Sequence, residues 1–151
     1  MQFSANHTAQ IIEILKEKRV AVAYLFGSLA TNSLTPLSDV DIAILFDSTA
    51  RGKDYSLLEL TLAKDIGRFL ETNRVDIINL ETSHNPLLKY HAVFSGTLLF
   101  ANDPSVRRRA ERRILSEYED TRHLRNISSA ILHRQIKEGR FGATKFHVTH
   151  R

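Results

Sequence analysis

The chain has 151 residues, of which 42% are hydrophobic, a formal net charge of +4 and no cysteine. This length and hydrophobic content predict one domain of ordinary size with a real core, and leave no room for a second large catalytic domain. The lack of cysteine excludes a disulfide framework and a thiolate metal site. No stretch is typical of a secretion signal or approaches the roughly 18 apolar residues of a membrane span, so we expect a cytoplasmic protein without membrane contact.

Helical and strand patterns alternate along the first two thirds of the chain. Amphipathic spacing or capping residues predict helices over 8–18, 55–72 and 86–94. Short apolar runs predict strands over 20–26, 39–46, 74–80 and 97–101. A polar loop is expected over 47–54, where Gly52 lies. This order of elements predicts an α/β (α+β) fold, with the chain divided into a domain over 1–102 and a basic helical extension over 103–151.

Two aspartates begin the second predicted strand. Val40, Ile42, Ile44 and Phe46 occupy alternate positions, so Asp39 and Asp41 project together from the opposite face. Like charges at close range repel, and a divalent cation is a common remedy. The dipeptide Gly27-Ser28 follows the first predicted strand, where a turn can hold phosphate oxygens through backbone N–H groups and a hydroxyl.

A third carboxylate interrupts the apolar run of the third predicted strand. Asp76 is costly to bury there unless it is paired, and it would join the other two acids if its strand lies beside theirs. Three carboxylates and a phosphate-holding turn predict a two-metal site for phosphoryl or nucleotidyl transfer. The alternative is that single aspartates at strand starts, and the Gly-Ser dipeptide, are ordinary turn formers.

The pattern of Gly27-Ser28, Ser38, Asp39-x-Asp41 and a later Asp76 resembles the polymerase-beta-like nucleotidyltransferase superfamily. Within it, the short length resembles the minimal nucleotidyltransferases (MNT), many of which are antitoxins of HEPN/MNT toxin–antitoxin pairs. The resemblance covers about residues 7–103 and implies a small mixed sheet flanked by helices.

The resemblance also implies a mechanism and a partner. Asp39, Asp41 and Asp76 would bind two Mg²⁺ ions and carry the catalysis, and Gly27, Ser28 and Ser38 would bind ATP. AMP would pass to a tyrosine hydroxyl of a cognate HEPN ribonuclease, forming a hetero-oligomer with it. Many relatives have Ala-Arg-Gly after the Gly-Ser turn, whereas here Ala30 precedes Thr31.

The missing arginine removes an expected triphosphate contact, for which Lys53 and Arg68 are candidate replacements. It also leaves two alternatives open. One is a non-catalytic antitoxin that masks its toxin by binding. The other is a small-molecule nucleotidyltransferase of the aminoglycoside-modifying kind, which usually needs a large second domain.

Positive charge is concentrated after residue 102. Residues 1–102 have a balance of −2 and residues 103–151 a balance of +6. Asp103-Pro104-Ser105 predicts a helix start, and apolar residues then recur at steps of three or four through Ile131, which predicts a long amphipathic helix, broken once. The arginines at 107, 108, 109, 112 and 113 suit a partner surface, a solvated face or, less favoured because aromatic residues are few, direct nucleic-acid binding.

Overall fold

The computed structural model describes residues 5–27 and 39–140, which form four strands, five α-helices and one short 3₁₀ helix. The strands are β1 (Val20–Phe26), β2 (Val40–Phe46), β3 (Val75–Asn79) and β4 (Thr97–Ala101). The helices are α1 (Ala5–Glu17), η2 (Ser48–Ala50), α2 (Tyr55–Leu70), α3 (Pro86–Phe94), α4 (Pro104–Asp120) and α5 (Arg122–Lys137).

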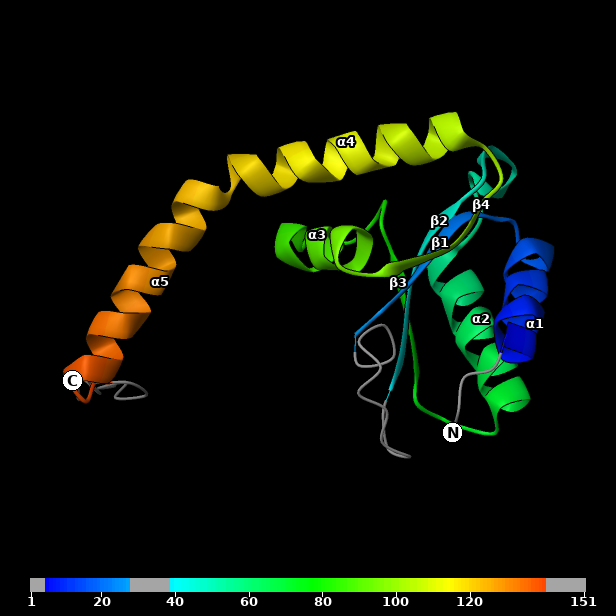
Figure 1. Cartoon of the computed structure of the whole chain (residues 1–151), viewed down its shortest axis with the longest axis horizontal. Helices are drawn as coiled ribbons and strands as arrows, with labels where there is room; N and C mark the ends of the chain where they lie inside the picture. Colours follow the sequence, from blue (N-terminus) through cyan, green and yellow to red (C-terminus); the bar gives the residue numbers. More distant parts are fainter. Residues whose placement is uncertain (1–4, 28–38, 141–151) are drawn as a thin grey trace, which may run out of the picture.

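The strands form one mixed sheet in the order β3-β2-β1-β4, and Figure 1 views this sheet nearly edge-on. The central strand β1 is antiparallel to β2 and to β4, whereas β2 is parallel to β3. Parallel neighbours need a crossover connection, and α2 supplies it between β2 and β3. The predicted small mixed sheet is therefore confirmed, and the parallel pair brings the starts of β2 and β3 to the same edge.

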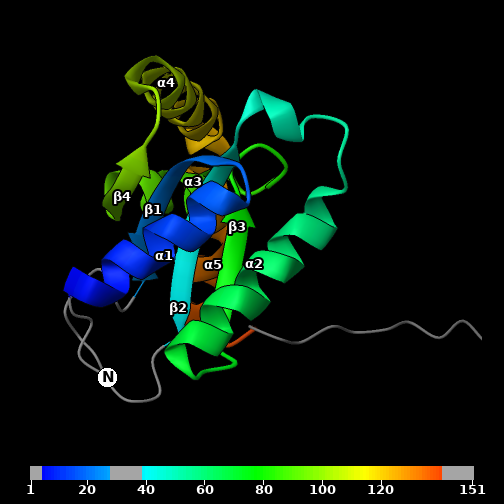
Figure 2. The same ribbon diagram turned by 90° about the vertical axis from the view of Figure 1, so that its right-hand side faces the viewer.

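Helices cover both faces of the sheet (Figure 2). Ile11 and Leu15 of α1 and Leu62 and Ile66 of α2 pack on one face, in a cluster with alternate residues of β2. Those β2 residues are the predicted set, namely Val40, Ile42, Ile44 and Phe46. Each is no more than 5% exposed, so alternation commits this face to the core and turns the aspartates to the other face.

The second core cluster lies on that other face, under α3 and α4. Ala43 and Leu45 of β2 pack there with Ala92 of α3 and with Ala110 and Ile114 of α4. Ile114 is fully buried. The helix α4 thus contributes side chains to the core of the sheet domain.

The loop expected over 47–54 contains the short helix η2. The side chain of Asp47 accepts hydrogen bonds from the backbone N–H of Thr49, at 2.8 Å, and of Ala50, at 3.2 Å. A single aspartate cap thus organises one turn of helix in a segment that has too few apolar residues to show periodicity.

The predicted break in the C-terminal helix is confirmed and lies at Thr121, between α4 and α5. None of the residues of α5 is buried, and the helix extends away from the sheet (Figure 1). Within residues 5–27 and 39–140, no helix has the length and apolar character needed to cross a membrane.

Candidate functional site

One edge of the sheet gathers the end of β1 and the starts of β2 and β3. Asp41 is paired in register with Phe26 of β1 on one side and with Asp76 of β3 on the other. Asp41 and Asp76 therefore occupy neighbouring positions on one face of the sheet. Asp39 precedes Asp41 by two residues, which places it on that face as well.

The turn after β1 runs directly against Asp41. Gly27 has a φ of +74°, and a Cβ atom built on it would overlap the Oδ2 carboxylate oxygen of Asp41. Only glycine adopts this conformation readily and leaves space for the carboxylate. The predicted nucleotide-binding residues Ser28 and Ser38, and the departure at Thr31, lie outside the described residues.

The three carboxylates act on one another electrostatically. The pKa of Asp41 is raised, first because the side chain is partly buried, and then because of the negative charges of Asp76 and Asp39. Each effect disfavours the ionised form of Asp41. A cation bound at this edge would relieve the repulsion.

The carboxylates suit a hard cation by their chemistry, because Mg²⁺ prefers oxygen ligands. However, among the residues that the structure describes, no group of three histidine, aspartate or glutamate side chains is close enough to hold a metal ion. Asp39 and Asp76 are exposed, whereas Asp41 is half-buried. The two-metal site therefore stays a prediction.

A cation that sequence reasoning missed completes this edge. The Nη1 atom of Arg74 lies 3.6 Å from Oδ1 of Asp39, and the carbonyl of Arg74 accepts a 2.9 Å hydrogen bond from the N–H of Val40. Arg74 is two residues before Asp76, as Asp39 is two before Asp41. Because β2 and β3 are paired in register, these four side chains occupy neighbouring positions on one face of the sheet. The same alternation that grouped the first two acids could have identified Arg74, had β3 been known to lie beside β2.

Neither Lys53 nor Arg68, the two cations considered from the sequence, lies beside these four residues. Lys53 follows η2, beyond the end of β2 opposite to Asp39. Arg68 lies on α2, the helix that covers the other face of the sheet.

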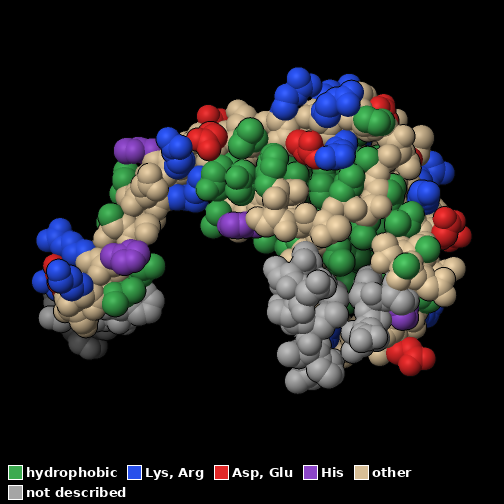
Figure 3. Space-filling model, in the orientation of Figure 1, with side chains coloured by type: hydrophobic (Ala, Val, Ile, Leu, Met, Phe, Trp, Pro, Cys, Tyr) green, Lys and Arg blue, Asp and Glu red, His purple; other side chains and the backbone are tan. Residues whose placement is uncertain are grey.

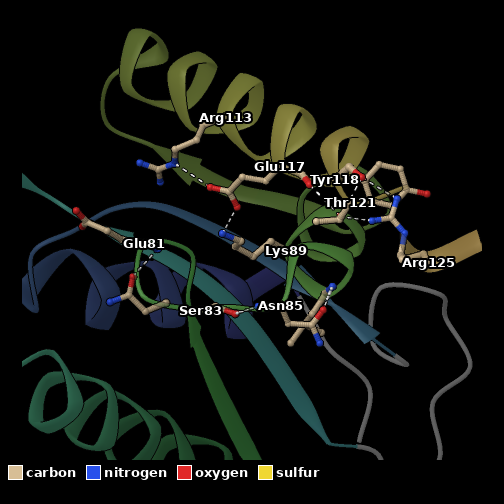
Figure 4. Close-up of polar contacts among 11 residues, drawn as sticks. Glu81, Ser83, Asn85, Lys89, Arg113, Glu117, Tyr118, Thr121 and Arg125 are labelled. Atoms are coloured by element: carbon tan, nitrogen blue, oxygen red, sulfur yellow. Dashed lines mark hydrogen bonds and ion pairs between the residues drawn. The ribbon is translucent and has the colours of Figure 1, made fainter. Parts of the chain in front are cut away.

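Two of the five arginines of the basic cluster are engaged in holding α4 on the domain. Arg107 donates from Nε to Glu111 at 2.7 Å, and the Tyr24 hydroxyl of β1 donates to the same carboxylate at 2.9 Å. Burial, followed by the hydrogen bond to Glu111, raises the pKa of Tyr24. Arg113 lies 3.9 Å from Glu117, which also pairs with the buried Lys89 of α3 (Figure 4).

Tyr118, the aromatic residue closest to the basic cluster in the sequence, is also occupied by packing. The ring of Tyr118 stacks on that of Tyr90 with centroids 3.9 Å apart, and the guanidinium of Arg125 lies 3.8 Å from its centroid. Bases would need a free ring face on which to stack. Tyr90 therefore packs against Tyr118, while Arg108, Arg109 and Arg112 remain exposed on α4.

A separate hollow of about 560 Å³ lies between η2 and α4, at the sheet edge opposite to the acids. Its lining mixes the arginines 51, 109 and 113 with the carboxylates of Asp47, Glu81 and Asp103. These opposite charges balance, so the hollow shows no preference for an anion or a cation.

The fold agrees with the comparisons. The model of the polymerase beta nucleotidyltransferase family matches residues 9–105, and the chain belongs to that family. This confirms the family predicted from the turn and the acids.

Several solved structures contain chains with a fold similar to that of this protein. One chain of a toxin–antitoxin complex named MntA-HpeT, in a substituted form, is 26% identical with a TM-score of 0.67, covering 89% of this chain and 99% of that one. A chain of a toxin–antitoxin complex with AMP-PNP is 24% identical with a TM-score of 0.68, covering 85% and 98%. A third comes from a complex of a tri-AMPylated Shewanella oneidensis HEPN toxin with its MNT antitoxin, at 23% identity and a TM-score of 0.62, covering 87% and 97%. Comparison with curated proteins finds no significant match.

Proposed function

We propose that this chain is a Mg²⁺-dependent adenylyltransferase that moves AMP from ATP to a tyrosine hydroxyl of a HEPN ribonuclease toxin, and so acts as its cytoplasmic antitoxin. The observation that carries the proposal is the strand register that places Asp39, Asp41 and Asp76 on one face beside the turn at Gly27, where burial and then the charges of Asp76 and Asp39 raise the pKa of Asp41. Family membership supports nucleotidyl transfer. The likeness to chains of toxin–antitoxin complexes supports the partner. We also propose the division of the chain into a domain over 1–102 and a basic helical extension over 103–151, of which α4 packs on the sheet.

In this proposal each described residue of the edge has a task. Asp39 and Asp41 would hold Mg²⁺, which when bound neutralises negative charge on the phosphates. Asp76 would accept the proton of the tyrosine hydroxyl as its oxygen attacks the α-phosphorus. The bond from that phosphorus to the bridging oxygen then breaks, and pyrophosphate leaves with the electron pair. Gly27, with Ser28 and Ser38 by the family pattern, would hold the triphosphate.

Arg74 would compensate for the arginine that the turn lacks. Its guanidinium already faces the acidic edge through Asp39, and five N–H donors in one plane suit phosphate oxygens. From this position the guanidinium would contact a phosphate of a nucleotide bound at the edge.

Transfer of radiolabel tests the proposal. A purified HEPN ribonuclease, sought first in the gene adjacent to that of this chain, is incubated with it, Mg²⁺ and ATP labelled at the α-phosphate. We expect label on a tyrosine of the HEPN protein, lost when Asp39→Ala and Asp41→Ala are combined. The absence of label with the native chain would refute the enzymatic proposal.

The second candidate is an antitoxin that masks its toxin by binding alone. Thr31 favours it, because the position following Ala30 lacks the arginine of many relatives. Inhibition of the ribonuclease that persists in the double alanine variant, with no label transferred by the native chain, would select this candidate.

A further inference from the structure

The helix α5 carries a broad apolar surface that nothing in the described chain covers. Five large side chains on it are 40% to 63% exposed, namely Leu124, Ile127, Ile131, Leu132 and Ile136. Their steps of three, four, one and four residues place them on one side of the helix. Figure 3 shows hydrophobic side chains exposed along this helix. An apolar face of this extent on a helix with no buried residue is typical of a binding surface.

The apolar surface continues into a groove at the base of α5. The groove holds about 500 Å³ between the first turn of α3, with Pro86 and Leu87, and the α5 residues Leu124 and Ser128. Leu87 is itself 39% exposed. A partner lying along α5 would therefore also contact α3.

Contacts at the junction between α4 and α5 orient this surface relative to α3. Arg125 of α5 donates from Nη2 to the carbonyl of Tyr118 at 2.7 Å and lies over the ring of that tyrosine. The ring stacks in turn on that of Tyr90 of α3. A preformed orientation lowers the ordering cost of association.

The charges on α5 indicate what covers it. The helix contains Arg122, Arg125, Arg134 and Lys137 and no acidic residue. Arg122 pairs with Glu119 before the helix and Arg134 with Glu138 after it, so the positive charge is compensated only in part. Two copies packed through their α5 stripes would bring like charges together around the apolar contact, which opposes a homodimer. A partner helix with an apolar stripe bordered by aspartate or glutamate is complementary in both respects.

We propose that α5 and the adjoining groove form the docking surface for an amphipathic helix of the partner protein, with acidic residues bordering the apolar stripe of that helix. This rests on the proposed function, in which the partner is a helical HEPN protein. The acidic edge near Asp41 and the α5 surface are then two separate sites, one for transfer and one for association.

The first test uses a designed peptide and the full chain. A fluorescein-labelled helix with leucines at helical spacing and glutamate on the flanks is titrated by fluorescence anisotropy, beside a twin with lysine on the flanks. We expect the native chain to bind the glutamate peptide at least tenfold more tightly than the lysine peptide. The glutamate peptide should bind at least tenfold more weakly to a variant combining Ile127→Glu and Ile131→Glu than to the native chain. Equal affinity for the two peptides, or for the native and double-variant chains, overturns the proposal.

A matched control separates this surface from general apolar exposure. Leu57 lies on α2 and is 60% exposed, compared with 52% for Ile131. Leu57→Glu should leave the peptide affinity unchanged, and circular dichroism should show that all variants remain folded. A similar loss with Leu57→Glu also overturns the proposal.

The second test uses the HEPN protein and distinguishes this proposal from the proposed function. If the native chain binds the HEPN protein and the α5 double variant binds at least tenfold more weakly, with unchanged ATP affinity, the docking surface stands. Equal binding by the double variant overturns the surface alone, whereas an unbound native chain that still prefers the glutamate peptide overturns the HEPN assignment alone. Sedimentation of the free chain should show a monomer, and a dimer that Ile131→Glu dissociates would assign the surface to a second copy.

Discussion

Replacing Asp41 by asparagine should raise stability while abolishing transfer. Asp41 is neighboured by Asp76 in register and by Asp39 two residues before; partial burial raises the pKa of Asp41, and both charges raise it further. Adjacent strands are about 4.8 Å apart, so two carboxylates about 6 Å apart repel by roughly 0.7 kcal/mol in water and roughly 3 kcal/mol at an effective dielectric constant of 20. Because the edge is partly solvated, we expect about 1 kcal/mol, or about 2–4 °C in Tm for a chain of this size.

The stability gained by Asp41→Asn relative to the native chain should depend on pH in a defined direction. The pKa of Asp41 in the folded chain lies above its ordinary value of 3.8. The folded state therefore retains the proton over a range in which the unfolded state has lost it, and the stability of the native chain falls as pH rises through the folded pKa. The Tm difference between the asparagine variant and the native chain should vanish below the ordinary pKa and grow toward pH 7.

Thermal unfolding with and without Mg²⁺ checks this reasoning. Mg²⁺ should raise the Tm of the native chain by relieving the repulsion and should have less effect on Asp41→Asn. Glu13→Gln on α1 is the matched control, because it removes one negative charge from an exposed position away from the acidic edge. A lower Tm for Asp41→Asn than for the native chain at pH 7, or an equal response of both to Mg²⁺, would refute the account.

Substitutions at four further positions test the site and the packing of α4 and α5. Gly27→Ala should lower ATP affinity at least tenfold and the Tm by several degrees, because its Cβ atom would meet the Asp41 carboxylate at a positive φ; an unchanged ATP titration contradicts the close approach. Arg74→Gln should tighten Mg²⁺ binding to the free chain and weaken ATP binding, both measured by calorimetry, whereas Arg74→Lys should retain part of the ATP affinity. Unchanged affinities of Arg74→Gln for Mg²⁺ and ATP would show that Arg74 is not part of the site. Ile114→Ala should destabilise the chain by about 2–5 kcal/mol in urea unfolding, whereas Ile131→Ala should cost less than about 0.5 kcal/mol, since one is fully buried and the other half exposed. Equal losses would mean that α4 and α5 do not differ in packing.

The sequence by itself determined the elements and the grouping of the first two acids. Alternation in β2 is a local property, because successive side chains of a strand point to opposite faces whatever lies around it. Val40 and Ile42 therefore fixed the side on which Asp39 and Asp41 project, and the structure buries those apolar residues as expected. The break before α5 was equally local, although its position at Thr121 was not predicted.

Only the tertiary structure decided which distant residues meet at the edge. Asp76 and Arg74 join the first two acids because β3 pairs in parallel with β2, and strand order depends on packing between segments more than 30 residues apart in the sequence. Likewise, an amphipathic pattern runs through both α4 and α5, but it does not state what each apolar stripe contacts. The sheet buries Ile114 of α4, while the stack of Tyr90, Tyr118 and Arg125 turns α5 away and leaves its stripe for a partner.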